Sequence, residues 1–277
     1  MSLVRPSVWQ LVVSALLAAG CGQSRQAAGG LRVVSLVPSV TEDIFALGAG
    51  GSLAGTTNQC DYPEAARRTF KVGDFATPDV ERIAALRPDL VFVALPLHAP
   101  LVEKLQELGI RTYASQPGNI AEVLAEIESV GVLLGRKGRA RAITESLAAQ
   151  LGLLPSWSDT PGVYIEISAA PMMTVGGRTF VADIVRRAGG RNVFDDAVVD
   201  YPVVTPEDVA ARNPDVVLVL HPGTSRVEVA QRVGWQRITA VRTGRIHDDI
   251  DDDLLMRPGP RAVEGVLELA KRLHDKR

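Results

Sequence analysis

Two stretches of the chain repeat the same order of hydrophobic and polar positions. Residues 81–96 align without gaps on residues 207–222, and half of the paired positions are identical. Each copy has helical spacing, then Pro-Asp, then a β-branched apolar run without polar alternation, which is typical of a strand buried in a parallel sheet. A Thr-Pro pair precedes both copies, so Thr77 and Thr205 are predicted to cap the two helices. The repeat therefore predicts two similar α/β lobes, each with a mainly parallel sheet covered by helices.

Further elements follow from the same kind of pattern. Apolar runs predict strands at residues 31–37, 110–114, 162–168 and 245–248. Helical spacing predicts helices at residues 41–47 and 179–187, which end before Gly48 and Gly189. The two lobes thus begin alike, with a strand that leads into a helix.

Between the lobes, residues 120–151 keep apolar side chains at helical spacing and predict one long linking helix. Three glycines, Gly131, Gly135 and Gly138, weaken its middle. The predicted organisation is an N-terminal lobe at residues 31–117, a linking helix at residues 118–155 and a C-terminal lobe at residues 156–277. A cleft is expected between the lobes, with the carboxyl ends of the parallel strands facing it.

The start of the chain has the pattern of an export signal. An apolar stretch over residues 8–19 follows Arg5 and is too short to span a bilayer. Small residues then precede Cys21, an arrangement typical of bacterial lipoproteins, in which the thiol carries lipid. We expect a signal peptide at residues 1–20 and a lipid-anchored tether at residues 21–30, in an exported protein. An ordinary signal peptide cleaved elsewhere remains an alternative, because Ala18 stands where leucine is preferred.

Composition narrows the class of protein. With 46% apolar and 22% charged residues the chain has the composition of a globular protein. A net charge of −2 argues against nucleic acid as a partner. If Cys21 carries lipid, Cys60 has no disulfide partner and is expected to be a small buried side chain. We expect a monomer.

Some candidates for contacts in the cleft follow from position alone. Pro38 and Ser39 end the first predicted strand, and Ser39 with Glu42 has the spacing of a helix capping box. His98 and His221 follow the two duplicated strands and are expected near the cleft, on opposite lobes. Each is either a rim histidine or a metal donor to a ligand, since neutral imidazole is a common metal ligand.

The ordered set of motifs resembles a known family. Residues 32–42, Cys60-Asp-Tyr-Pro63, residues 177–193 and Arg257-Pro-Gly-Pro-Arg261 are similar to the helical-backbone (class III) substrate-binding proteins of ABC importers. These proteins carry vitamin B12, iron-siderophores or heme, and the Cys-Asp-Tyr-Pro segment is most similar to the B12 branch. The resemblance implies a non-enzymatic protein that binds a corrinoid (cobalamin or cobinamide) and delivers it to a permease and its ATPase.

The resemblance also implies roles for individual residues. It places Gln59, Phe75 and Tyr201 against the cargo, and the aromatic rings suit a flat ligand. It brings Arg257 and one or two residues of the acidic run 248–253 to the same site, with Asp252 and Asp253 as the candidates. The glutamates expected to dock the permease are Glu103 and Glu228.

Other cargoes and other classes of protein remain as alternatives. Ferric siderophore or heme is the alternative cargo, with no resident cofactor expected in either case. An extracytoplasmic metal-dependent hydrolase would need His98, His221, His247 and the acidic run to converge, although the sequence lacks the common hydrolase motifs. A structural or sensory lipoprotein that has lost its ligand is a third class.

Overall fold

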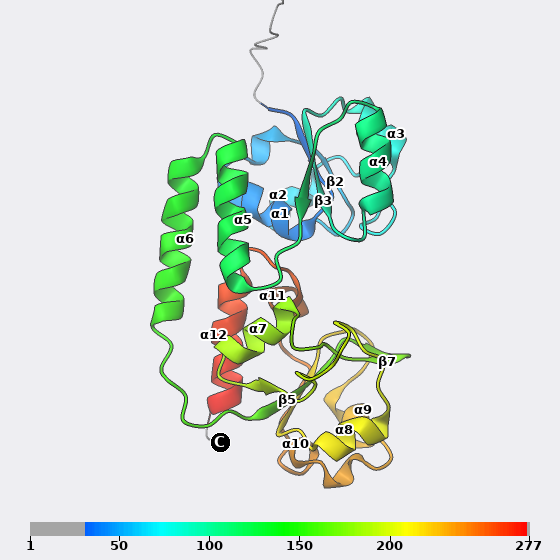
Figure 1. Ribbon diagram of the computed structural model, residues 1–277, viewed down its shortest axis with the longest axis vertical. Coiled ribbons are helices and arrows are strands. Elements are labelled where there is room, and N and C mark those ends of the chain that lie inside the picture. The colour runs from blue at the N-terminus through cyan, green and yellow to red at the C-terminus, as the bar shows by residue number, and fades with distance from the viewer. Residues whose placement is uncertain (1–30, 276–277) are drawn as a thin grey trace, which may run out of the picture. The chain divides into compact units, whose positions relative to one another are not determined.

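Two four-stranded parallel sheets form the framework of the protein, whose computed structural model describes residues 31–275 (Figure 1). The first sheet has the order β2-β1-β3-β4 and the second the order β10-β9-β5-β8. If the small β6–β7 hairpin is set aside, both sheets run second, first, third and fourth strand. The prediction of two similar α/β lobes is confirmed. The strands are β1 Val33–Ser35, β2 Leu53–Thr56, β3 Leu90–Ala94, β4 Thr112–Ser115, β5 Gly162–Glu166, β6 Ser168–Ala169, β7 Met172–Met173, β8 Arg191–Asn192, β9 Val216–Val219 and β10 Ile246–His247.

The aspartate of the duplicated Pro-Asp motif makes the same hydrogen bond in both lobes. Asp89 accepts a hydrogen bond from the backbone N–H of Arg32 at 2.8 Å, at the start of the first strand. Asp215 accepts an equivalent bond from Gly162 N–H at 2.8 Å, where β5 begins. The carboxylate therefore ties the third strand of each lobe to the first, which explains why this side chain recurs in the repeat.

Helices cover both sheets and join them. They are α1 Pro38–Ala46, α2 Glu64–Arg67, α3 Val80–Ala85, α4 Ala99–Glu107, α5 Ile120–Leu133, α6 Lys137–Gly152, α7 Phe180–Arg187, α8 Pro206–Arg212, α9 Arg226–Ala230, α10 Thr239–Arg242, α11 Asp252–Met256 and α12 Ala262–His274, with short 3₁₀ turns at Gly50–Ser52 and Trp235–Arg237. Thr205 caps α8 in a capping box with Asp208, as predicted. The cap predicted at Thr77 is wrong, because α3 begins later and Asp79 caps it.

The link between the lobes is two helices instead of the one long helix that the periodicity predicted. Helix α5 ends at Leu133, Gly135 adopts a left-handed φ of +67°, and α6 starts at Lys137. The two helices lie side by side (Figure 1). A Cβ on Gly131 would come within 2.4 Å of the Ala140 Cβ, so this glycine permits the close approach. The glycines that weakened the helical pattern thus form a turn and a contact surface.

The two lobes share a hydrophobic core. One cluster of buried apolar side chains contains Val33 and Phe92 of the first sheet and Val163 and Leu218 of the second. Helices α1, α5, α7 and α12 contribute the side chains between them. Because these side chains pack continuously, the lobes are held together by more than their covalent link.

The predicted signal peptide, the tether and Cys21 lie outside the described residues. Within residues 31–275, none of the helices has the length and apolar character that crossing a bilayer requires.

Candidate functional site

A cavity of about 530 Å³ lies where the two lobes meet. It is within the size range of small-molecule sites. The first lobe and the start of α5 contribute Val37, Pro38, Ser39, Phe75, Ala94, Leu95, Pro96, Ser115, Gln116, Pro117, Gly118 and Glu122. The second lobe and the segment before α12 contribute Arg178, Thr179, Phe180, Val181, Asp200, Tyr201, Met256, Arg257 and Pro258. Of the residues predicted to contact cargo, five line this cavity, namely Pro38, Ser39, Phe75, Tyr201 and Arg257.

The loop that carries Phe75 is held in place by two side chains behind it. The Nε2 atom of His98 lies 2.6 Å from the Phe75 carbonyl oxygen, and its Nδ1 accepts a bond from Ala94 N–H at 3.0 Å. Gln59 Oε1 accepts a bond from Phe75 N–H at 2.7 Å. The neutral Nε2–H tautomer of His98 satisfies both of its contacts.

His98 and Gln59 therefore position the aromatic wall and do not line the cavity. His98 is 2% exposed and both ring nitrogens are occupied, so the prediction that it could ligate a metal in the cleft is wrong. Its position just before α4 takes the ring behind the cavity wall. Sequence position after a strand could not reveal this direction.

On the second lobe the wall is a loop that is held by the segment just before α7. Gly176 N–H donates to the Asp200 carbonyl at 2.8 Å, and Arg178 pairs with the Asp200 carboxylate at 3.2 Å. Tyr201 follows and keeps 55% of its surface exposed, as a ring available to a ligand. Burial first, and then the charge of Asp200, raise the pKa of the Tyr201 phenol. The phenol therefore holds its proton firmly.

His221 lies away from the cavity, and its prediction as a cleft ligand is also wrong. Its Nε2 lies 3.0 Å from Glu166 Oε1, and its Nδ1 lies 3.1 Å from the Pro222 carbonyl. Arg232 binds both oxygens of the same carboxylate. Glu166 is fully buried at the end of β5, so His221 lies against a buried ion pair of Glu166 and Arg232 inside the second lobe.

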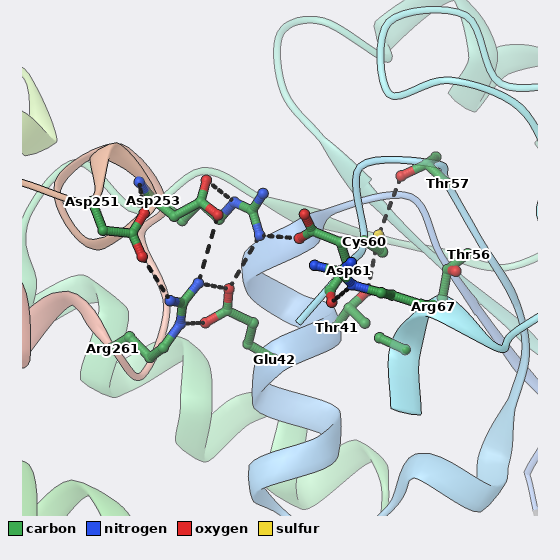
Figure 2. Close-up of polar contacts among 12 residues, drawn as sticks. Thr41, Glu42, Thr56, Thr57, Cys60, Asp61, Arg67, Asp251, Asp253 and Arg261 are labelled. Carbon is green, nitrogen blue, oxygen red and sulfur yellow. Dashed lines mark hydrogen bonds and ion pairs between the residues drawn. The ribbon is translucent and has the colours of Figure 1, made fainter. Parts of the chain in front are cut away.

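Figure 2 shows a network of charged side chains, in which Arg257 is a residue that also lines the cavity. Arg261 donates to both oxygens of Glu42 at 2.8 Å, and the Glu42 side chain is 1% exposed. Arg257, which lines the cavity, reaches Asp61 at 2.7 Å and Asp253 at 2.7 Å. Burial opposes the ionisation of Asp61, but the hydrogen bond and charge of Arg257 outweigh it and lower its pKa. The segment before α12 is thus bound to α1 and to the Cys60-Asp-Tyr-Pro turn of the first lobe.

This network corrects three predictions. Glu42 does not form a capping box with Ser39, because α1 begins at Pro38 and Ser39 lies inside its first turn, while Glu42 turns toward the arginines. Asp253 is engaged by Arg257, and Asp252 is exposed; neither lines the cavity. Burial, with neighbouring aspartates adding to it and Arg257 opposing it, raises the pKa of Asp253 to about 6.

Sequence reasoning missed two buried carboxylates, one on α5 and one on α1. Glu126 on α5 is 6% exposed and accepts a bond from Ser115 Oγ at 2.9 Å. Asp43 on α1 is 1% exposed, and neither of its carboxylate oxygens has a hydrogen-bond partner among residues 31–275. Burial, and then the charges of Glu126 and Glu42, raise the pKa of Asp43 well above its ordinary value. The sequence offered one signal for this feature, because Asp43 is a charged residue in a helix whose neighbouring residues are buried.

The remaining candidates are Cys60 and the two glutamates that were predicted to dock the permease. Glu103 is exposed on α4, and Glu228 is exposed on α9, where its carboxylate caps the helix at Ser225. Cys60 is 1% exposed, as expected, and its Sγ lies 3.2 Å from Thr41 Oγ1.

The histidines required by a metal-dependent hydrolase do not converge. In the part of the chain that the structure describes, one group of three potential metal-binding side chains occurs, the exposed Asp251 and Asp252 with the half-buried Asp253. Asp251 caps α11 by accepting a bond from Asp253 N–H. No histidine joins this group, so the arrangement assumed for hydrolysis is wrong for the described residues.

Comparison with known proteins gives the class. The sequence matches the periplasmic binding protein family over residues 33–252, and the chain belongs to that family. It is 32% identical over 254 residues to an uncharacterised ABC transporter substrate-binding lipoprotein of Bacillus subtilis, YvrC, with 88% of this chain and 80% of the relative covered. It is 32% identical over 270 residues to the vitamin B12-binding protein of Vibrio vulnificus (strain CMCP6), with 92% and 95% covered.

Solved structures agree with this assignment. The apo form of the periplasmic heme-binding protein RhuT from Roseiflexus sp. RS-1 superposes with a TM-score of 0.78 at 25% identity, with 89% of this chain and 99% of that chain covered. The protein is therefore an extracytoplasmic binding protein of the ABC transporter type, with a small-molecule cargo and with a permease and ATPase as partners. These relatives are solute-binding proteins, as the sequence motifs implied.

Proposed function

We propose that this protein binds a corrinoid, cobalamin or cobinamide, in the cavity between its lobes and delivers it to an ABC importer. The observation that carries the proposal is the cavity itself, with Phe75 on one lobe facing the same space as Tyr201 on the other. Two aromatic rings on opposite walls suit a broad, flat ligand, because ring faces provide contact area. The B12-binding relative, of which 95% is covered, supports the same cargo.

The charges around the cavity favour a cargo without strong charge of its own. Arg257 is paired with Asp61 and Asp253, and Arg178 is paired with Asp200. Glu122 accepts bonds from Gly118 N–H and Asn119 at the start of α5. An anionic cargo would have to replace these partners, whereas the amide groups of a corrinoid can bond to them as they stand.

The alternative cargo is heme or a ferric siderophore. The heme-binding structural relative supports it, and the Tyr201 oxygen is a possible donor to iron. Against it stands the raised pKa of that phenol, because iron coordination requires the deprotonated oxygen.

Calorimetry on the purified protein tests the choice. Cyanocobalamin, dicyanocobinamide, heme and a ferric siderophore would be titrated separately, and a corrinoid is expected to bind most tightly. Phe75→Ala should weaken that binding about ten- to hundredfold, as expected for the loss of a buried aromatic contact. Phe70→Ala, in a ring that is 54% exposed and outside the cavity, is the matched control and should bind normally. Failure of both corrinoids, or equal effects of the two variants, would contradict the proposal.

We also propose that Cys21 carries a lipid that holds the protein at a membrane. The cysteine follows an apolar stretch and small residues, and the YvrC relative is named a lipoprotein. Expression of Cys21→Ser in a bacterial host should move the protein from the membrane fraction to the soluble extracytoplasmic fraction, as measured by immunoblotting. If the wild-type protein is already soluble, the anchor is wrong. The docking roles of Glu103 and Glu228 remain part of the proposal for the permease partner.

A further inference from the structure

Ser115 connects the cargo cavity to a buried acid. This serine ends β4, lines the cavity and is 3% exposed. Its hydroxyl donates to Glu126 Oε2 at 2.9 Å, and Glu126 is buried behind it. Ser115 Oγ is the hydrogen-bond partner of the Glu126 side chain among the described residues. A change at Glu126 therefore reaches the cavity through one hydroxyl.

The direction of this hydrogen bond depends on the proton of Glu126. An ionised carboxylate only accepts, so Ser115 must give its single proton to Glu126 and can offer the cavity only lone pairs. A protonated carboxyl group can donate to Ser115 Oγ instead. The serine O–H is then free to turn toward the cavity and donate to a bound molecule, while it keeps a lone pair for a donor.

The surroundings of Glu126 bring the loss of its proton near neutral pH. Burial raises its pKa to about 7, although the bond from Ser115 acts in the opposite direction. Asp43 on α1 is buried nearby, and Glu42 on the same helix is paired with Arg261. Tyr113 of β4 is a third acidic neighbour, and burial followed by the charges around it raises its pKa.

The other charged groups next to α5 have partners of their own. Asp183 of α7 accepts from Ile120 N–H at 3.0 Å and pairs with Arg187. On α6, Thr144 donates to Glu128 of α5 at 3.0 Å. No cation is bonded to Glu126 among residues 31–275.

We propose that Glu126 is a positioning residue for the cargo, whose protonation state decides whether Ser115 can donate a hydrogen bond into the cavity. This inference rests on the proposed function, because it takes the cavity between the lobes as the cargo site. It predicts that the protein binds its cargo more tightly at mildly acidic pH than at mildly alkaline pH.

Calorimetry with cyanocobalamin at pH 6 and pH 8.5 tests the inference. The wild-type protein should bind about three- to tenfold more tightly at pH 6, the effect of one net hydrogen bond to a peripheral amide carbonyl. Glu126→Gln should bind with the same affinity at both pH values, because its amide group can donate to Ser115 throughout. Ser115→Ala should also lose the pH dependence, at the weaker affinity. Glu128→Gln, on the same helix but facing α6, should retain the wild-type profile.

A measurement without cargo separates the possible failures. In protein labelled with ¹³C at glutamate carboxyl groups, the NMR signal absent from Glu126→Gln should titrate near pH 7. Titration close to the ordinary value of 4.5 overturns the inference even if cargo binds. Cyanocobalamin binding that does not change with pH overturns the inference alone, whereas no binding at either pH overturns the proposed function and the inference with it.

Discussion

Replacing Glu42 by alanine is expected to lower the free energy of unfolding by about 3–5 kcal/mol, the effect of removing one partner from a buried ion pair. Glu42 is 1% exposed and accepts two bonds from Arg261, whose side chain is 15% exposed. Without the carboxylate, Arg261 stays largely buried beside Arg257 and the two cations repel each other. Urea denaturation at pH 7 measures the loss.

Two further variants show whether burial is the cause. Glu64→Ala removes an exposed partner of Arg67 and should cost less than about 1 kcal/mol. A double variant, Glu42→Leu with Arg261→Met, removes both buried charges and should recover most of the loss, since the uncompensated charge is gone. If Glu42→Ala were as mild as Glu64→Ala, the network would not hold the segment before α12 to the first lobe.

The free energy of unfolding is expected to fall as the pH rises from 5 to 8, because of Glu126. The folded protein keeps the Glu126 proton up to about pH 7, whereas the unfolded chain releases it near 4.5. Between these values the folded state binds more protons, so stability is greatest below them and is lost as the pH rises. At 1.36 kcal/mol for each pH unit in that interval, the fall attributable to Glu126 is about 3 kcal/mol.

Denaturation curves at several pH values should show this fall in the wild-type protein and a smaller one in Glu126→Gln, which has no proton to lose. Asp43 contributes in the same direction, because its pKa is also raised by burial. Asp43→Asn should therefore flatten the remaining slope. Glu128→Gln serves as the control on the same helix. Parallel curves for wild type and Glu126→Gln would contradict the assignment of a proton to this site.

Much of the site was beyond sequence reasoning because it depends on the direction of side chains. Phe75 and Tyr201 were predicted at the cleft and do line the cavity, since both are large rings in loops at the carboxyl ends of strands. His98 occupies a similar loop yet points behind the wall, toward the carbonyl of Phe75. Position along the chain places a loop at an edge of a sheet, but the backbone turn decides which way each side chain points.

The two buried carboxylates, Asp43 and Glu126, were also beyond sequence reasoning. Asp43 and Glu126 are 83 positions apart by number, and neither belongs to a motif. Helices α1 and α5 meet only because the apolar side chains on their faces pack into one core. A buried carboxylate whose pKa is raised is therefore a product of packing and could not be read from either segment alone.

The amino-acid sequence was sufficient to predict the two α/β lobes, because buried strands and helix ends are local patterns that a duplication repeats. It also carried the family motifs. The packed structure was needed to show that the link folds back at Gly135 as two helices, that the segment before α12 binds the first lobe through Glu42, and that Ser115 joins the cavity to a buried acid. These features arise from contacts between distant residues, whose geometry and burial exist only once the chain has packed.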